Sequence, residues 1–273
     1  MQLAARKNYY DVLNLLLYSN RNINISSNYF LGYNKLTRIS LPSSLRVIEH
    51  GTFMNCSSLA EISIPSSITE IRTFAFNGCE SLKNITIPSS VTSIGSFAFG
   101  GCSSLESFLI GFPSQLVDIK QGTFSGCSSL TQISIPSSVK SIGFEVFNNC
   151  SSLAQVSFEE PSSLKVINQD AFYNCSSLTQ ITIPSSVILI GSNAFNDCSS
   201  LEQITIPSNI ETIEESTFSG CSSLKKVEIP SSVISIKEKA FYNCFSLEEI
   251  TIHSSLINID DFAFPENTNI IRE

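Results

Sequence analysis

The chain has 273 residues, of which 42% are hydrophobic and 15% are charged, with 16 basic against 24 acidic residues. A net charge of −8 without a basic run argues against nucleic acid as a partner, because phosphate binding depends on clustered Lys and Arg. No stretch approaches the ~18 apolar residues that a membrane-spanning helix needs, so no membrane insertion is expected.

The first 24 residues differ in pattern from the rest of the chain. Apolar residues between Ala4 and Leu17 are spaced as one stripe of a helix, and an Asn-Ile-Asn triplet follows them. In this arrangement the segment resembles the second half of an ankyrin repeat. One half-repeat cannot bury its own apolar face. Residues 1–24 are therefore predicted to form a helical cap on the following coil, or else to be a remnant of an ankyrin-fused protein.

From residue 25 onward the sequence repeats a unit of about 23 residues. Nine cysteines recur at spacings of 23 or 25 residues, at Cys56, Cys79, Cys102, Cys127, Cys150, Cys175, Cys198, Cys221 and Cys244. Each unit approximates L-x-x-I-x-I-P-S-S-V-x-x-I-x-x-x-A-F-x-x-C-S-S, and ten L-x-x-I-x-I segments occur between Leu36 and Leu247. A period of this length indicates a solenoid, in which each coil buries its apolar side chains against its neighbours.

Each unit contains two extended segments and two changes of direction. The I-x-I segment is typical of a short strand with one buried face, and Pro-Ser-Ser bends the chain after it, because proline fixes φ and has no amide donor. A second extended segment, V-x-x-I, follows. Phe and Cys three residues apart then predict a short helical or 3₁₀ turn. Residues 25–273 are thus predicted to form an α/β, mostly β, solenoid of about ten coils. Its parallel sheet would lie on the concave face, with short helical turns opposite.

The nine cysteines are expected to form a ladder of buried, reduced thiols. Their spacing is unlike that of zinc ligands, and one residue of an odd number must stay unpaired if neighbours form disulfides. The two histidines, His50 and His253, lie nearly nine coils apart and cannot share a site. No phosphate-binding loop or nucleophile elbow is present. No catalytic residue, metal or cofactor is therefore predicted, and an enzyme is not expected.

The repeated motif resembles the BspA-like leucine-rich repeat of bacterial and protist surface proteins over about residues 25–270. The resemblance implies a leucine-rich-repeat solenoid that binds protein or extracellular-matrix macromolecules, as an adhesin-like surface antigen on the cell surface. An intracellular, cytoplasmic interaction scaffold is the alternative, because no signal peptide or transmembrane segment is visible and reduced thiols fit a reducing compartment. Oligomeric state cannot be read from the pattern.

The outward-facing residues of the I-x-I strands form the candidate binding surface. The candidate residues are Leu109, Phe112, Gln132, Ser134, Gln155, Ser157, Gln180, Thr182, Gln203 and Thr205. Most are neutral and able to form hydrogen bonds, so affinity would come from area and multivalency. The alternative is that Ser, Thr and Gln only keep a β face soluble. Templating of ice or mineral is disfavoured, because only one column is rich in Ser and Thr.

Two units are two residues longer than the others. One inserts Gly111-Phe112 before a proline, and the other inserts Glu159-Glu160 before a proline. Insertions in repeat proteins map to loops on one face, which is often the binding face. Leu109 also stands where other units have Ser or Thr, so Leu109 and Phe112 are predicted to form an exposed apolar patch. The alternative is that each insertion is a tolerated bulge.

Overall fold

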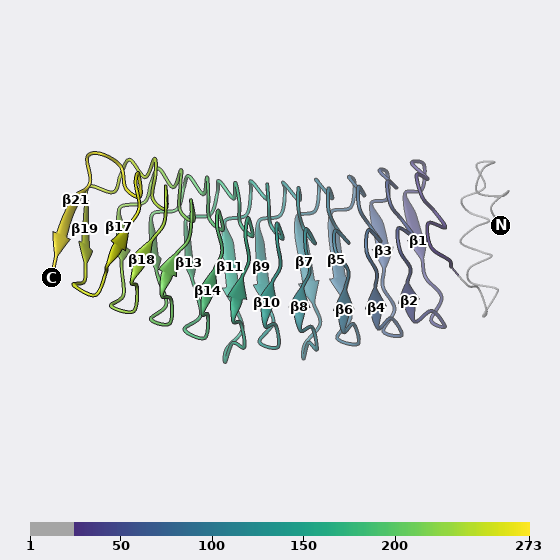
Figure 1. The fold of residues 1–273 in the computed structure, drawn as a ribbon. Helices are drawn as coiled ribbons and strands as arrows, with labels where there is room; N and C mark the ends of the chain where they lie inside the picture. The colour runs from purple at the N-terminus through teal and green to yellow at the C-terminus, as the bar shows by residue number, and fades with distance from the viewer. Residues whose placement is uncertain (1–24) are drawn as a thin grey trace.

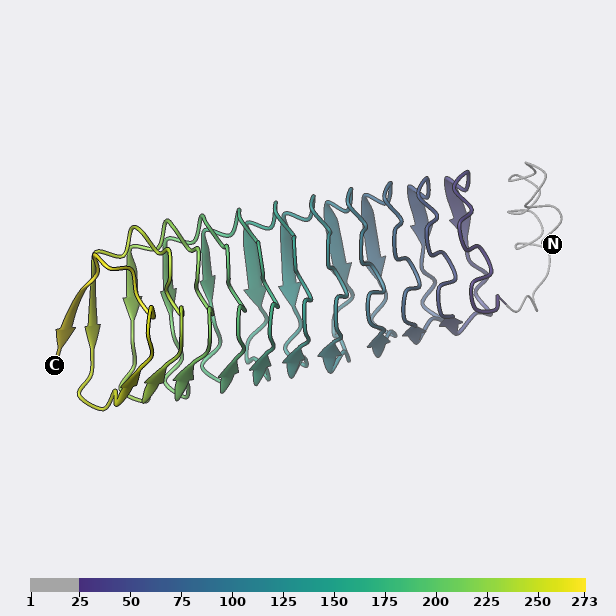
Figure 2. The same cartoon turned by 45° about the horizontal axis from the view of Figure 1, so that its top comes forward.

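The computed structural model describes residues 25–273; the helical cap predicted for residues 1–24 lies outside the described residues. The described chain is one stack of β coils (Figure 1), in which equivalent residues of neighbouring coils are 23 or 25 positions apart, and 20 apart at the last step from β19 to β21. Two rows of parallel strands line separate sides of the stack (Figure 2). The predicted mostly β solenoid of about ten coils is therefore confirmed.

The I-x-I segments form the first row of strands, which we call the long-strand sheet; strand pairing is interrupted between β3 and β5, between β11 and β13, and between β17 and β19. Its strands are β1 (Arg38–Ser40), β3 (Glu61–Ser63), β5 (Asn84–Ile87), β7 (Ser107–Ile110), β9 (Gln132–Ile135), β11 (Gln155–Phe158), β13 (Gln180–Thr182), β15 (Gln203–Thr205), β17 (Lys226–Glu228), β19 (Glu249–Ile252) and β21 (Asn269–Arg272). Paired strands are parallel and in register, for example Ile39 beside Ile62 and Ile181 beside Ile204. Each type of side chain therefore forms a column along the stack.

The V-x-x-I segments form a second parallel row, the short-strand sheet. Its strands are β2 (Val47–Ile48), β4 (Glu70–Ile71), β6 (Ser93–Ile94), β8 (Asp118–Ile119), β10 (Ser141–Ile142), β12 (Val166–Ile167), β14 (Leu189–Ile190), β16 (Thr212–Ile213), β18 (Ser235–Ile236) and β20 (Asn258–Ile259). The Pro-Ser-Ser bend joins the two sheets. Its second serine is tied to the preceding coil, as where the Ser138 hydroxyl donates to the carbonyl oxygen of Leu116 at 2.6 Å. The bend is thus held by a neighbouring coil as well as by proline.

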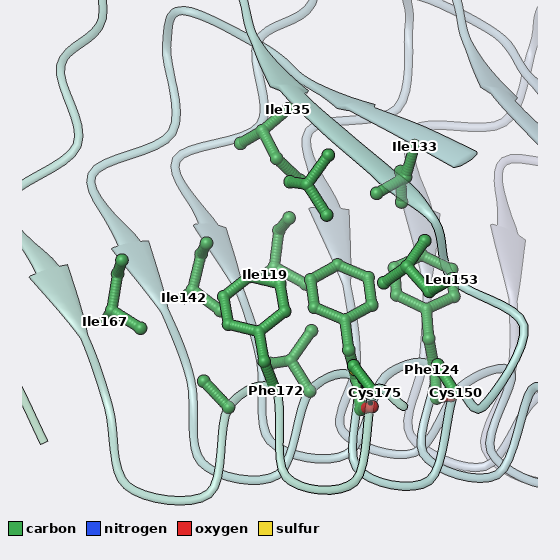
Figure 3. Close-up of a cluster of buried hydrophobic side chains, with 14 of the residues drawn as sticks. Ile119, Phe124, Ile133, Ile135, Ile142, Cys150, Leu153, Ile167, Phe172 and Cys175 are labelled. Atoms are coloured by element: carbon green, nitrogen blue, oxygen red, sulfur yellow. Dashed lines mark hydrogen bonds between the residues drawn. The ribbon is translucent and has the colours of Figure 1, made fainter. Parts of the chain in front are cut away.

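A column of stacked phenylalanine rings fills the interior between the two sheets. It comprises Phe30, Phe53, Phe76, Phe99, Phe124, Phe147, Phe172, Phe195, Phe218, Phe241 and Phe264, with ring centroids 5.1–6.0 Å apart. In Figure 3, isoleucines of both sheets point toward the rings of Phe124 and Phe172. These spacings fall within the range of favourable aromatic pairs. The core is therefore a continuous row of like residues.

The cysteines form a second buried column beside the phenylalanines. All nine are free thiols without solvent exposure. Each thiol donates a hydrogen bond to the carbonyl oxygen of the phenylalanine of the preceding coil, as from Cys150 to Phe124 at 3.1 Å and from Cys175 to Phe147 at 3.2 Å. Burial raises the pKa of Cys102 and Cys150 to about 12. The predicted ladder of buried cysteines is confirmed.

The prediction of short helical turns opposite the sheet was wrong, since no helix occurs among residues 25–273. Instead, alternate amides of the Phe-x-x-Cys segment bond to the next coil, as from Phe53 N to Ala75 O at 2.8 Å and from Asn55 N to Asn77 O at 2.7 Å. The intervening amide of Met54 bonds back to Gly51 O at 3.0 Å. Alternate donors are thus used between coils, and the segment becomes a series of linked turns.

The residue before each cysteine has a positive φ, which explains its restricted type. The residues at this position are Asn55, Gly78, Gly101, Gly126, Asn149, Asn174, Asp197, Gly220 and Asn243. Gly, Asn and Asp are the types that adopt the left-handed region at lowest cost. The recurring Asn-Cys-Ser sequences are therefore explained by backbone geometry.

Gly126 offers a test of this explanation. A Cβ atom at Gly126 would lie 3.7 Å from its nearest neighbour, so there is room for a side chain and only the positive φ restricts the choice. Gly126→Asn is expected to change the free energy of unfolding by less than ~0.5 kcal/mol, whereas Gly126→Val should cost ~1–2 kcal/mol. Urea denaturation measures both. Equal losses for the two variants would contradict the explanation.

Candidate interaction surface

The long-strand sheet carries nine of the ten predicted residues, and the eight polar ones lie in two parallel columns that face solvent. One column contains Gln132, Gln155, Gln180 and Gln203, and the other contains Ser134, Ser157, Thr182 and Thr205; all eight are exposed. We call these eight residues the polar strip. The strands that carry it have isoleucine, valine or phenylalanine on the opposite face, directed into the core. The alternation of the strand thus exposes every hydrogen-bonding group of the strip.

The polar strip is uncharged, and charged pairs flank it toward both ends of the stack. Arg38 and Glu61 form an exposed ion pair of 2.7 Å on β1 and β3. Lys226 and Glu228 form another of 2.7 Å within β17, and the hydrogen bond from Lys226 lowers the pKa of Glu228. Solvent screens such exposed pairs, so they contribute little to stability. Their position marks where the neutral surface ends.

The surface is hollowed between β7 and β9. Strands β5 and β7 are in register over four residue pairs, and so are β9 and β11, but β7 and β9 are paired only at Ser107 and Gln132. A hollow of about 260 Å³ lies where the two strands diverge, and we call it the β7–β9 hollow. Its lining includes Leu109, Ile110, Gln132, Ser134, Gln155 and Glu159. The divergence occurs in one of the two longer units.

The two predicted apolar residues are Leu109, which lines this hollow, and Phe112, which lies just beyond the end of β7. Leu109 is 58% exposed and lines the hollow, whereas Phe112 is 81% exposed and follows the end of β7 by two residues. Phe108, on the opposite face of β7, packs edge-on against Phe99 and Phe124, with ring centroids 5.1 and 4.6 Å apart. The large residue of β7 is therefore buried, and the exposed ones remain available for contact.

The second longer unit lies two coils further along the stack. The two enlarged bends extend beyond the other bends on the same edge in Figure 1, one beside β7 and β8 and the other beside β11. Glu160 lines a neighbouring hollow of about 340 Å³ between β11 and β13, while Glu159 belongs to the β7–β9 hollow. The sequence pattern places both carboxylates in an insertion that is expected to form a loop on one face. The 25-residue unit length is the sequence signal that links them to a surface feature.

The surface supplies hydrogen bonds and apolar contact. Within residues 25–273, no three His, Cys, Asp or Glu side chains are grouped as metal ligands. No helix in the described part of the chain is long and apolar enough to span a bilayer. Burial raises the pKa of the thiols, so their reactive thiolate form is suppressed. What the geometry offers is an extended contact surface.

Comparison with known proteins yields one family and several similar structures. The model of the BspA type leucine rich repeat region, with six copies, matches residues 23–154 and 152–271. The crystal structure of a leucine rich cell surface protein from Faecalibacterium prausnitzii is 31% identical, with a TM-score of 0.57; the match covers 91% of this chain and 76% of that chain. No curated protein sequence matches significantly.

Two further solved structures are similar. The pneumococcal vaccine antigen PcpA is 24% identical with a TM-score of 0.60; the match covers 84% of this chain and 59% of PcpA, which shows a shared fold. A leucine rich repeat protein of T. pallidum is 30% identical with a TM-score of 0.47, over 77% of each chain. On its family match and the coil geometry described above, this chain belongs to the BspA type leucine-rich repeat family.

Proposed function

We propose that this chain is a non-enzymatic binding solenoid of the cell surface, which acts as an adhesin-like antigen and contacts host or matrix macromolecules through the long-strand sheet. The polar strip is the observation that carries this proposal. Its eight hydrogen-bonding side chains are exposed, in register within each of the strand pairs β9–β11 and β13–β15, and the fold does not use them for its own packing. An extended partner would meet the same donors and acceptors at each coil.

The strip favours binding through area. Each neutral hydrogen bond contributes little on its own, because it replaces a bond to water. Repetition along the stack lets one partner engage several coils at once, which multiplies weak contacts. Since the strip is uncharged, its share of the affinity should depend only weakly on salt.

Location at the cell surface is supported by the family and by the F. prausnitzii relative, whose description is a cell surface protein. The reduced thiols favour the alternative, an intracellular scaffold. Burial weakens this argument for an intracellular location, because a thiol with a pKa of about 12 has almost no thiolate to oxidise at neutral pH. Free cysteines in this interior are thus compatible with an oxidising exterior.

A pair of matched variants tests the binding face. Ser134→Arg with Thr182→Arg adds two positive charges to the strip, two coils apart so that they do not repel strongly. Thr92→Arg with Asn258→Arg adds the same charge to exposed positions near or on the short-strand sheet. We expect the wild type to bind at least one of immobilised fibronectin, laminin, collagen and fibrinogen. The strip variant should lose about tenfold in affinity and the control almost none.

The location is tested separately from the binding face. Antibody labelling of intact cells of the source organism should detect the chain at the surface. Equal losses in the two double variants would reject the polar strip as the binding face. Detection only in the cytosol would instead favour the intracellular scaffold.

A further inference from the structure

We infer that the β7–β9 hollow and its two enlarged bends receive a protruding basic loop of a partner protein, one that carries Lys or Arg beside an apolar side chain. This inference rests on the proposed function, because the partner is assumed to lie on the long-strand sheet. It adds the chemistry of the partner and a single place on the sheet where specificity would arise.

Leu109 is an apolar residue in a column that is otherwise mostly Ser and Thr. Thr86, on the strand before, and Ser134, on the strand after, occupy the position that Leu109 takes in β7. A polar residue therefore suits the fold at this position, and Leu109 leaves more than half of its surface in water. Phe112 adds an exposed aromatic ring to the same unit. Aromatic side chains of this kind are enriched among residues that dominate binding energy.

The size of the hollow limits what can enter it. A volume of about 260 Å³ is below the ~300–1,000 Å³ usual for small-molecule sites, and the hollow is open to the sheet surface. It can receive one or two side chains, while the backbone that carries them stays outside on the polar strip. An extended loop of a protein meets both requirements.

The charge of the site selects a basic occupant. Glu159 lines the hollow and Glu160, the next residue, is exposed at the neighbouring hollow between β11 and β13; neither is among the ion pairs formed by residues 25–273. Strands β7 to β15 of the long-strand sheet contain no Lys, Arg or His. An acidic loop would be repelled here without compensation, whereas a guanidinium or ammonium group would find the first opposite charge on this part of the sheet.

Local hydrogen bonds hold the two carboxylates in place. One oxygen of Glu159 accepts from the amide of Ser137 at 3.2 Å, and one oxygen of Glu160 accepts from the amide of Ser162 at 3.0 Å. A carboxylate has two oxygens with several lone pairs, so each group can still accept from a cation. The Phe112 ring can add a cation–π contact to an Arg or Lys that approaches it.

Binding of defined peptides to the full chain tests the inference. Four synthetic peptides of equal length are immobilised on a biosensor: one alternates leucine and arginine, one leucine and glutamate, one serine and arginine, and one leucine and glutamine. We expect the leucine–arginine peptide to bind best, with an affinity that falls as salt rises. Leu109→Ser, which installs the residue of the neighbouring coils, should weaken this binding about tenfold, equivalent to about 1.4 kcal/mol. Glu160→Gln should weaken it less and reduce its salt dependence.

Ile188→Ser provides the matched control, because Ile188 is 56% exposed beside the short-strand sheet and far from the hollow. Equal binding of all four peptides, or an equal loss in Leu109→Ser and Ile188→Ser, would overturn the inference. So would concentration-dependent self-association of the wild type that Leu109→Ser abolishes, since the occupant would then be a second copy. Matrix binding that the strip variant loses but Leu109→Ser retains would reject this site and leave the proposed function intact.

Discussion

Raising the pH from about 8 to about 10 is expected to remove most of the stability of this solenoid. Nine buried thiols must stay protonated in the folded chain, because burial raises their pKa well above the ordinary value of 9.0, to about 12 for Cys102, Cys150 and Cys198. In the unfolded chain the same thiols ionise near pH 9. The unfolded state therefore binds fewer protons above this pH, and the free energy of unfolding falls.

The sign and size follow from the two pKa values. Below about pH 9 both states hold the thiol protons and there is no effect; the loss then grows until the pH approaches about 12. At pH 10 each thiol contributes on the order of 1 kcal/mol of destabilisation, so the nine together contribute on the order of 10 kcal/mol. This is comparable to the ~5–15 kcal/mol total stability of a typical domain.

A triple variant separates the thiols from other groups that titrate in this range. Cys127→Ser, Cys150→Ser and Cys175→Ser keep a hydrogen-bond donor toward the phenylalanine carbonyl but do not ionise near pH 9. Six thiols instead of nine should reduce the slope of stability against pH by about a third. Urea denaturation at a series of pH values measures the slope. An unchanged slope would show that thiol ionisation does not govern alkaline unfolding.

Phe147→Ala is expected to cost ~3–5 kcal/mol, since it opens a cavity in the middle of the phenylalanine column. Phe147 has no solvent exposure, and its ring lies 5.4 Å from Phe124 and 5.1 Å from Phe172, measured between centroids. Loss of this ring removes stacking on both sides as well as apolar burial. The free energy of unfolding in urea is the measurement.

Phe144→Ala is the control within the same coil. Phe144 lies three residues earlier and is 50% exposed, so its removal leaves no closed cavity and should cost less than ~1 kcal/mol. A loss below ~1 kcal/mol for Phe147→Ala would show that Phe147 is not an internal column residue.

The periodic positions are sufficient to predict the stack and its core. Leu130 and Phe147 recur as the same residue types along the stack and the Ile133 position stays apolar, and a single coil cannot bury these side chains. In-register stacking is the arrangement that places each beside its own copies, and the structure has it. The same argument predicts the buried thiols and the exposed polar columns, because alternation along a strand assigns each side chain to one face.

The local turn conformation could not be predicted in the same way. When one unit is considered alone, Phe and Cys three residues apart fit a helical turn as well as they fit a series of linked turns. The linked turns form because the amides of Phe53 and Asn55 donate to carbonyl oxygens of the next coil. These acceptors are more than 20 residues away in the sequence, so one unit does not contain them. The second parallel sheet arises from similar pairing between coils.

The sequence by itself determined the coil, its period, its buried columns and the neutral character of its exposed face, because these follow from residue types at fixed spacing. Only the tertiary structure decided where that face is hollowed. Two extra residues can be absorbed in a strand or in a bend, and the choice depends on which amides the neighbouring coils can satisfy. Here β7 keeps its register with β5 and diverges from β9, and this divergence places Leu109 and Glu159 around one hollow.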